Sequence, residues 1–488
     1  MKKKLNYILS IDQGSTSTRT VVYDENLTLV CTSQREIKEF YPNNGWVEQD
    51  PKEVLRSVGE TLLEAVNKNN IHKECILSIG LTNQRETIVF WNKKTLEPLS
   101  PAISWQCLRG IDFCNSIIGT KLEAMINKST GLKVDPYFSF SKIVWALRNI
   151  KSLFEKKDIC VGTIDSWILA NIVDGNPHIT EITNASRTGL FNTKTETWDI
   201  KILEELDIPM SILPKVVKSN HNFGVLNENI LGKKIPINSI LGDQQSSLYG
   251  HKNNEETEIK CTFGTGGFLL IDTAEKRYNF NQNFLSTISN KIGKKSNHAL
   301  EGTILSAGSL IEWLKSIDIF QENKQIEEYL NNSNFNEILI VPALNGLGAP
   351  FWDGEIRASI ENINSSYNKN DILRAGFESV AFSTKSIVDS IEKTINYKIK
   401  SIKIDGGLSR SIFFNQLLSN LLNIVVRVSN NNEMTSLGVA KLSLENISKK
   451  KLSYNSYKDF FPEKENYNRI NKKYNDWKNL ILNKISMR

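Results

Sequence analysis

Two segments far apart in the chain share one pattern: an apolar strand, a polar turn with glycine, a second strand and a closing aspartate. The first segment runs from Tyr7 to Asp24 around the turn Gln13–Thr16. The second runs from Glu258 to Asp272 around the turn Gly264–Gly267. Two short apolar runs joined by a glycine-containing turn predict a β-hairpin. We therefore predict one folding unit that is used twice, although the two segments differ in detailed sequence.

The length of the chain agrees with two lobes. Its 488 residues exceed the ~100–200 residues of an ordinary domain. Hydrophobic residues make up 40% and charged residues 23% of the chain, which is typical of a globular protein. We expect a first lobe over residues 1–252 and a second over residues 253–488, with a peripheral helical tail without chemistry from about residue 449.

Local signals predict further elements that alternate between strand and helix. Asp50 suits the N-cap and Pro51 the first position of a helix whose apolar residues recur at helical spacing. Short apolar runs predict strands over 76–82, 159–163, 237–241 and 402–405. This alternation indicates an α/β architecture.

Composition excludes several classes of function. The net charge of +6 comes from 60 basic and 54 acidic residues, an excess too small to indicate a nucleic-acid partner. No apolar run approaches the ~18 residues of a membrane helix, so we expect no stable membrane insertion. The lysine-rich start precedes an apolar stretch too short for a secretory signal, which favours a cytoplasmic location. The six cysteines form no C-x-x-C pair, so we expect reduced thiols without structural zinc.

The first hairpin turn suits an anion. Its backbone N–H groups and hydroxyls could form a concave site for phosphate, and a nearby arginine adds positive charge. Asp12, at the strand end, is a natural anchor for Mg²⁺. A plain surface hairpin explains this segment equally well, but two such turns could clamp a triphosphate between them. The residues concerned are Ser15, Thr16, Ser17 and Arg19, with Thr265 in the second turn.

Other strand ends carry polar residues, and each of them could have either a functional or a purely structural role. Asp243 could accept a proton from a substrate hydroxyl during phosphoryl transfer, or it could only cap a helix. Arg85 and Glu86 could bind polyol hydroxyls, or they could form a surface ion pair. Gly406 and Gly407 could let a flat ring approach the backbone, or they could form a plain strand-to-helix turn.

Three aromatic residues could form the wall of a site for a small polar substrate. They are Trp105, Tyr137 and Phe268. Taken singly, each aromatic side chain is more typical of a core.

Together these segments resemble the glycerol-kinase branch of the FGGY family of carbohydrate kinases. The resemblance covers roughly residues 7–440, and four of its motifs are specific to this branch: GWVEQDP, NQRET, DPYFS and GDQQ. It rests also on SIDQGSTSTRTVVYD, STGLKVDPYFSFSKIVW, TNASRTGLFN, TFGTGGF, PALNGLGAPFWD and IDGGLSRS. It implies an α/β fold of two lobes, actin-like or ribonuclease-H-like, with the active site in the cleft between the lobes.

The resemblance also implies a reaction, in which Mg-ATP donates its γ-phosphoryl group to glycerol and leaves sn-glycerol 3-phosphate and ADP, a step in glycerol uptake and catabolism. It assigns the general base to Asp243. It assigns the substrate contacts to Arg85, Glu86, Tyr137, Asp243 and Gln244, with Trp105 and Phe268 against the carbon chain. It assigns the nucleotide contacts to Ser15, Thr16, Ser17, Arg19, Thr265, Gly308, Glu312, Gly407 and Ser411. Asp12 and Asp243 are the carboxylates on the Mg²⁺ side.

This chain departs from the family at several places, including the stretch 358–366, which lacks glycines usual in the family. Glu312 stands where relatives commonly carry Gln, and Ser411 where they carry Asn, so nucleotide preference is the property affected. Bacterial relatives can carry a glycine-rich loop with arginine through which sugar bisphosphates inhibit them. Here the corresponding stretch, Leu231–Ile235, is shorter and has no arginine. We therefore predict that such inhibition is weak or absent.

Two alternatives stay open at this point. A kinase for another small polyol or ketose, such as dihydroxyacetone or a pentulose, would keep the ATP hairpins but not the set of Arg85, Glu86 and Tyr137. A non-catalytic, actin-like nucleotide switch would need neither a polyol site nor a base at Asp243. The resemblance further implies a homo-oligomer, a dimer or a tetramer.

Overall fold

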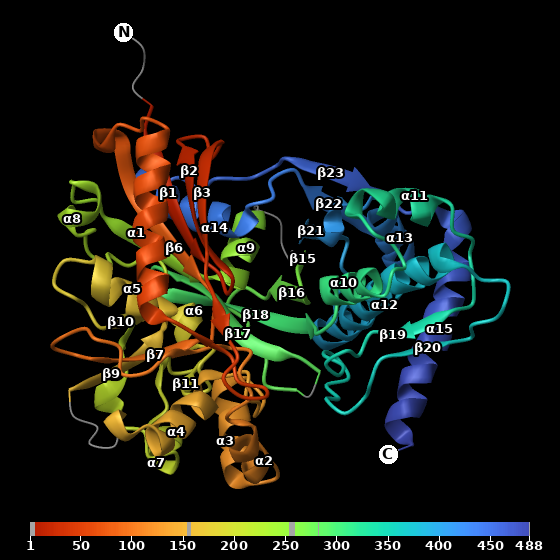
Figure 1. Cartoon of the computed structure of the whole chain (residues 1–488), viewed down its shortest axis with the longest axis horizontal. Helices are drawn as coiled ribbons and strands as arrows, with labels where there is room; N and C mark the ends of the chain where they lie inside the picture. Colours follow the sequence, from red (N-terminus) through yellow and green to blue (C-terminus); the bar gives the residue numbers. More distant parts are fainter. Residues whose placement is uncertain (1–4, 154–157, 253–258, 282, 488) are drawn as a thin grey trace.

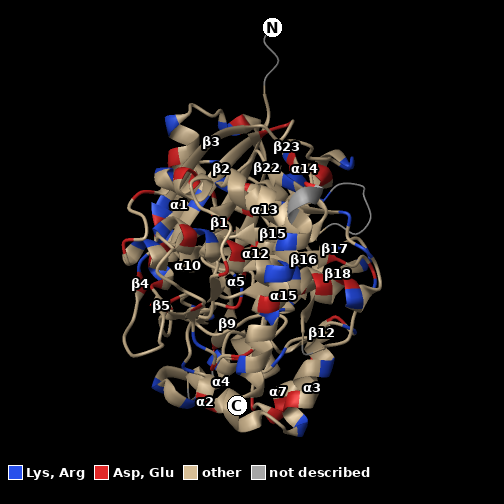
Figure 2. Ribbon diagram, turned by 90° about the vertical axis from the view of Figure 1, so that its right-hand side faces the viewer, with Lys and Arg blue, Asp and Glu red and all other residues tan. Residues whose placement is uncertain are grey.

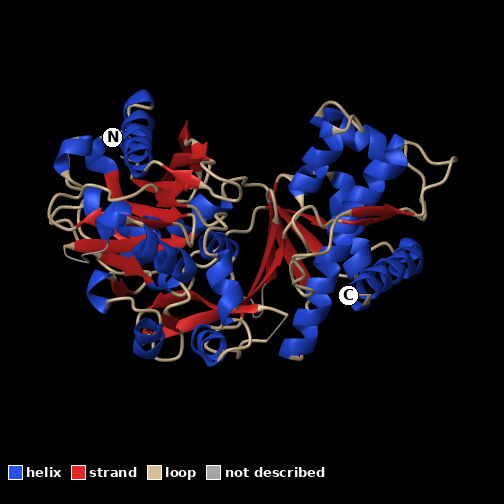
Figure 3. Cartoon of the chain, turned by 60° about the horizontal axis from the view of Figure 1, so that its bottom comes forward, coloured by secondary structure: helices blue, strands red, loops and turns tan. Residues whose placement is uncertain are grey.

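The computed structural model of the chain describes residues 5–487, except 154–157, 253–258 and 282. Two lobes lie side by side, each built of strands with helices packed around them (Figure 1, Figure 3). The expected boundary between residues 252 and 253 adjoins a segment that lies outside the described residues, and it stays a prediction. The two-lobed α/β fold itself is confirmed by the two large sheets.

The main sheet of the first lobe has five strands in the order β14-β6-β1-β2-β3. Strand β2 pairs antiparallel with both β1 and β3, whereas β6 and β14 run parallel to β1. The expected hairpin is therefore formed by β1 and β2, and the expected strands at 76 and 237 lie beside it. The bounds are β1 (Tyr7–Gln13), β2 (Ser17–Asp24), β3 (Leu29–Glu36), β6 (Ile76–Asn83) and β14 (Ile237–Gly242).

The main sheet of the second lobe has seven strands in the order β17-β18-β16-β15-β21-β22-β23. Strand β16 pairs antiparallel with β15 and β18, whereas β21 and β22 run parallel to β15. Five consecutive strands of this sheet thus repeat the order and direction of the first sheet, which confirms the predicted repeat. The bounds are β15 (Ile259–Phe263), β16 (Gly267–Asp272), β17 (Leu285–Ile292), β18 (Lys295–Ile304), β21 (Ser401–Gly406), β22 (Val425–Ser429) and β23 (Tyr457–Phe460).

A helix follows the outer parallel strand of each repeat. In the first repeat β14 leads into α9 (Asp243–His251), and in the second β22 leads into α14 (Met434–Ser448). These two helices pack against each other, and α14 also packs on β1, β6 and β14 of the first sheet. The chain therefore crosses back to the first lobe after completing most of the second.

The rest of the first lobe forms a second layer around a smaller sheet, ordered β4-β5-β8-β7-β9. Helix α1 covers β2 and β3, and Asp50 caps it by accepting a hydrogen bond of 2.9 Å from the backbone N–H of Lys52, as predicted. The bounds are β4 (Glu39–Phe40), β5 (Glu48–Gln49), α1 (Pro51–Lys68), β7 (Ile88–Asn92), β8 (Ala102–Ile103), α2 (Ile111–Ile117), α3 (Lys121–Thr130), α4 (Ser139–Asn149), β9 (Ile159–Thr163), α5 (Ile164–Ile172), β10 (Ile179–Glu181), α6 (Ile182–Ala185), β11 (Phe191–Asn192), β12 (Thr197–Trp198), α7 (Ile200–Glu205), β13 (Lys215–Val217) and α8 (Glu228–Leu231).

Helices of the second lobe flank its sheet, and the C-terminal tail belongs to this packing. Strand β23 extends the sheet beside β22, and Trp477 of α15 is fully buried with its indole Nε1 donating to the Ile340 carbonyl at 2.8 Å. Basic residues lie along the outer side of α15 (Figure 2). The prediction of a peripheral tail was wrong in this respect, because the apolar residues of α15 recur at helical spacing and complete the core. The bounds are α10 (Gly308–Ser316), α11 (Ile326–Asn331), β19 (Leu339–Val341), β20 (Ser359–Glu361), α12 (Lys369–Ile395), α13 (Ile412–Leu422) and α15 (Lys464–Ser486).

The expectations about membrane helices and cysteines can be compared with the structure of the described residues. Within them, every helix is too short or too polar to cross a membrane. All six cysteines are free thiols, and all but Cys31 are buried.

Candidate active site

The parallel strands of the first sheet end together, and their last residues form one side of the site. Strand β6 lies between β1 and β14, with Asn83 opposite both Gln13 and Gly242. The residues that follow these strand ends therefore meet at one edge of the sheet. There the Arg85 Nε lies 3.2 Å from an Asp243 carboxylate oxygen. The structure thus brings together two of the predicted site residues.

A buried ion network joins this edge to the second lobe. The Arg85 guanidinium donates two hydrogen bonds to the Glu301 carboxylate on β18, at 2.8 and 3.1 Å. Arg187 donates to the same carboxylate at 3.1 Å and to Glu86 at 2.5 Å. Paired, two-pronged contacts of this kind fix orientation as well as charge. Glu301 therefore holds Arg85 in place from the opposite lobe.

The carboxyl groups of this network differ in pKa because their charged neighbours differ. Burial alone would raise the pKa of Glu301, but Arg187 and Arg85 outweigh it and lower that pKa to about 2. Burial raises the pKa of Asp243, and Arg85 acts against this shift. The Asp243 side chain is 30% exposed, whereas those of Arg85 and Glu301 are at most 2% exposed. Asp243 is thus a carboxylate that is open to a ligand on one side. Its raised pKa makes it a better proton acceptor than an ordinary aspartate.

The backbone at Glu86 is held in an unusual conformation. Its φ of +63° lies in the left-handed region, which is costly for a residue with a side chain. Thr87 N–H donates to the Arg85 carbonyl at 2.7 Å across this residue, and the Ser139 hydroxyl donates to the Glu86 carbonyl at 3.0 Å. This turn directs the side chains of two consecutive charged residues into one buried network.

Aromatic side chains lie next to the first hairpin. The Trp105 indole Nε1 donates to the Ser15 hydroxyl at 2.8 Å, and its ring meets that of Tyr137 edge to face at 5.5 Å between centroids. Lys142 Nζ donates to the Tyr137 carbonyl at 2.6 Å and so fixes the loop that carries this ring. Phe268 lies on β16 of the other lobe, partly buried against Leu248, Leu270 and Ala299.

The second hairpin meets two glycines that were predicted to contact nucleotide. Gly308 N–H donates to the Gly264 carbonyl at 3.0 Å, and Ser309 N–H donates to the Thr265 carbonyl at 3.0 Å. Gly407 N–H donates to the Phe263 carbonyl at 2.7 Å. The three segments around Thr265, Gly308 and Gly407 therefore converge, and they leave backbone without side chains where a flat ring would need access.

The two departures that concern nucleotide, Glu312 and Ser411, lie at the edge of this region. Glu312 is exposed on α10. Ser411 caps α13, where its hydroxyl accepts from the Phe414 N–H at 3.1 Å. The contacts of both residues with nucleotide stay predictions.

Asp12 lies in surroundings that suit a divalent cation. Burial and the neighbouring Glu433 raise the pKa of Asp12 to about 7, with a further contribution from Asp243. Arg19 contacts Glu433 at 3.3 Å. Within the described residues no three His, Cys, Asp or Glu side chains are close enough to hold a metal by themselves. Oxygen donors of this kind fit Mg²⁺, which usually takes one or two carboxylates together with phosphates and water.

Reasoning from the sequence missed several charged residues of the site: Arg187, Lys260, Glu301 and Glu433. Two of them carried a usable signal. Lys260 is the one charged residue of β15, and Glu301 follows the apolar residues Ala299 and Leu300 of β18; both side chains are fully buried. Because a buried charge requires partners, such a residue predicts a polar site. The partners themselves lie too far away in sequence to be identified.

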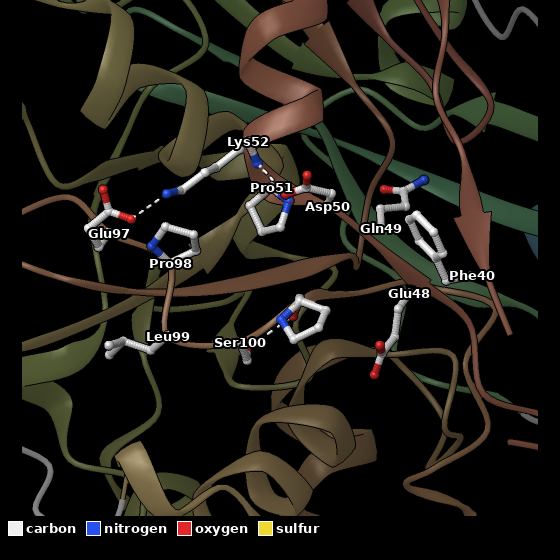
Figure 4. Close-up of a pocket in the computed structure, with 11 residues that line it drawn as sticks. Phe40, Glu48, Gln49, Asp50, Pro51, Lys52, Glu97, Pro98, Leu99 and Ser100 are labelled. Carbon is white, nitrogen blue, oxygen red and sulfur yellow. Dashed lines mark hydrogen bonds and ion pairs between the residues drawn. The ribbon is translucent and has the colours of Figure 1, made fainter. Parts of the chain in front are cut away.

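A separate cavity of about 540 Å³ opens beside the start of α1 (Figure 4). It contains the ion pair between Lys52 and Glu97, at 2.6 Å. None of the predicted site residues lines it. Gln49 links this cavity to the site, because its side chain accepts from Gln84 at 2.9 Å and donates to the Ser15 carbonyl at 2.5 Å.

Comparisons with known proteins find relatives over nearly the whole chain. The N-terminal domain of the FGGY family of carbohydrate kinases matches residues 7–250, and the C-terminal domain of that family matches residues 259–444. The chain is 37% identical to a glycerol kinase of Aliivibrio fischeri (strain MJ11), over 97% of this chain and 96% of that protein. It is 39% identical to a glycerol kinase of Shewanella woodyi, over 91% and 90% of the two chains. A crystal structure of Plasmodium falciparum glycerol kinase with ADP superposes with a TM-score of 0.89 at 31% identity, covering 97% of both chains.

Proposed function

The chain belongs to the FGGY family of carbohydrate kinases, and we propose that it transfers the γ-phosphoryl group of ATP to glycerol, yielding sn-glycerol 3-phosphate and ADP. The observation that carries this proposal is the Asp243 carboxylate, partly exposed and 3.2 Å from the buried Arg85 guanidinium. Relatives that share 37–39% of their residues with this chain are glycerol kinases. A homo-oligomer, as the resemblance implies, is part of the same proposal.

In the proposed reaction Asp243 accepts the proton of the attacking hydroxyl. Burial raises the pKa of this carboxyl above its ordinary value, which makes it a better proton acceptor, while Arg85 keeps it oriented. Arg85, Glu86, Tyr137 and Gln244 bind the polyol hydroxyls. Trp105 of the first lobe and Phe268 of the second lobe flank the carbon chain of the polyol. A three-carbon polyol offers little apolar area, so its affinity depends on these polar partners.

The two hairpins hold the triphosphate in the proposed complex. The turn at Ser15, Thr16 and Ser17, with Arg19 nearby, binds it from the first lobe, and Thr265 binds it from the second. Gly308 and Gly407 border the base and ribose. Asp12 and Asp243 would hold Mg²⁺, which when bound neutralises charge on the phosphates. Phosphoryl transfer depends mainly on positioning and charge, so these groups suffice together with one base.

A substrate panel tests the proposal directly. Purified protein with Mg-ATP should release ADP fastest with glycerol, and more slowly with dihydroxyacetone, pentuloses or larger polyols, when ADP formation is followed by a coupled assay. A clear preference for dihydroxyacetone or a pentulose would identify a different kinase of the family. ATP binding without turnover on any polyol would instead indicate a nucleotide switch.

Asp243→Asn tests the base. It should lower kcat with glycerol by at least about a hundredfold, because the amide cannot accept the proton. Affinity for ATP, measured by calorimetry, should change little. Asp112→Asn, the same change at an exposed acid in the first turn of α2, is the matched control. Near-normal turnover of Asp243→Asn would remove this residue from the role.

A further inference from the structure

One buried lysine has no place in the mechanism above. Lys260 lies on β15 and its side chain is fully buried. Within the described part of the chain, no carboxylate oxygen lies within ion-pair distance of its Nζ. Instead the ammonium donates to the Gln244 side-chain oxygen at 2.7 Å and to the Thr262 hydroxyl at 2.9 Å. Burying a cation without a direct counter-ion is costly, so this residue requires an explanation.

The contact with Lys260 determines which way the Gln244 carboxamide points. The oxygen and nitrogen of such an amide are assigned from their partners, and an ammonium group can only donate. The atom that faces Lys260 is therefore Oε1, which leaves Nε2 on the other side. Within the described residues Nε2 has no acceptor. The Gln244 side chain is fixed by a partner at one end and carries two unused donors at the other.

The position of Gln244 places these donors beside the proposed base. Gln244 follows Asp243 at the start of α9, and its backbone N–H donates to the Asp243 carboxylate at 2.6 Å. Lys260 reaches it from the strand that leads into the second phosphate hairpin. The contact therefore connects the polyol side of the site to the nucleotide side.

We propose that Lys260 is a positioning residue that holds the Gln244 carboxamide so that its Nε2 donates to an oxygen of the polyol. This inference rests on the proposed function, in which Gln244 binds a hydroxyl of glycerol. The substrate group at this point must then accept a hydrogen bond, which hydroxyl and carbonyl oxygens do and a methylene group does not. A site built around such a donor discriminates against a substrate that lacks the oxygen.

A double-mutant cycle separates this role from general support of the fold. Lys260→Met removes the donor and should raise the KM for glycerol about tenfold, with the KM for ATP within about twofold of wild type. In the Gln244→Ala background the same change should alter the KM for glycerol less than about twofold, because its target is gone. Independent effects of the two changes, or a rise in the KM for ATP instead, would overturn the proposal.

Two further variants complete the design. Lys403→Met removes a buried lysine directly opposite Lys260 on the neighbouring strand β21, and it should leave the KM for glycerol unchanged. Should Lys260→Met not fold, as judged by circular dichroism, Lys260→Leu, which also lacks a donor, replaces it in the cycle. If wild type prefers another polyol, the proposed substrate is wrong and the cycle is run with that polyol. Non-additive KM effects there still support the role of Lys260, and additive effects overturn it.

Discussion

Glu301 shows how much of this protein depends on single buried side chains. It lies on a strand of the second sheet, and it is the acceptor for guanidinium groups of both Arg85 and Arg187. All three side chains are at most 2% exposed. Charges buried this deeply stabilise a fold only as a set, since each is an unpaired charge without the others. The position of the Arg85 side chain, and with it the proposed polyol site, therefore depends on this carboxylate together with that of Asp243.

Glu301→Gln tests this dependence. The amide removes the charged partner that two buried guanidinium groups share and leaves Asp243 and Glu86 as their remaining carboxylates. We therefore expect the free energy of unfolding to fall by about 3–5 kcal/mol. Urea unfolding followed by fluorescence measures the change. Glu322→Gln is the matched control, because Glu322 pairs with Lys324 on the surface, where both side chains are more than half exposed. A loss no larger than that of the control would contradict the role of Glu301.

Among the elements, the short helix α6 supports the strand end that carries Asp243. Glu181 caps this helix by accepting from the Thr183 N–H at 2.8 Å, and it also accepts from the Ser219 hydroxyl at 2.5 Å. The Thr183 hydroxyl in turn accepts from the Gly242 N–H at 2.9 Å. A chain of hydrogen bonds therefore runs from a buried acid to the residue before the proposed base.

Glu181→Gln should change how stability depends on pH. Burial raises the pKa of Glu181 to about 8 from an ordinary value of 4.5. Between these values the folded chain binds more protons than the unfolded chain, so this group lowers the free energy of unfolding as pH rises. The amide does not titrate, and the stability of the variant relative to wild type should grow from about pH 5 to about pH 8. Urea unfolding across this range measures it, and parallel curves for the two proteins would count against the assignment.

For the whole molecule, the arrangement of the lobes depends on the packing of α9 against α14. Gly438 makes this close approach possible, because a Cβ at this position would lie 1.8 Å from the Ser246 carbonyl oxygen. Helix α14 also lies on the sheet of the first lobe. The two helices that follow equivalent strands of the repeat thus connect the lobes, and α9 begins at Asp243.

Gly438→Ala should therefore destabilise the protein although alanine favours helices. Overpacking against the α9 backbone should cost about 1–3 kcal/mol, seen as a lower Tm. Gly59→Ala is the matched control, since Gly59 lies in α1 with nothing within 4 Å of the added Cβ. That control should raise stability by roughly 0.5–1 kcal/mol. Equal effects of the two changes would show that the helix crossing is not tightly packed.

Regulation by sugar bisphosphates is also a property of the whole molecule. In the stretch 231–235, which the resemblance matches to the arginine-containing loop of some bacterial relatives, Lys233 contacts Glu74 at 3.0 Å and Lys234 contacts Asp174 at 2.9 Å. Both cations already have carboxylate partners, which leaves little positive charge for a phosphate group. We expect fructose 1,6-bisphosphate to leave the rate of glycerol phosphorylation nearly unchanged in a kinetic assay. Strong inhibition by this compound would show the prediction to be wrong.

Sequence reasoning succeeded where the signal was local. The hairpins around Gly14 and Thr265, the helix cap at Asp50 and the strand before Asp243 each depend on neighbouring residues, and the structure confirms them. It failed for the C-terminal tail, where the burial of Trp477 depends on a surface built by the rest of the second lobe. It also missed Lys260, because the partner that gives this residue a role follows a different strand.

The sequence by itself determined that one strand-turn-strand unit occurs twice, and that Asp12, Arg85 and Asp243 each follow or end a strand. Those properties are local, because turn chemistry and apolar spacing act over a few residues. Only the tertiary structure decided that Glu301 fixes Arg85, that Lys260 orients Gln244 and that α14 returns to the first lobe. Buried charges and close helix contacts take their partners from whichever segments the fold brings near, and no local pattern specifies those segments.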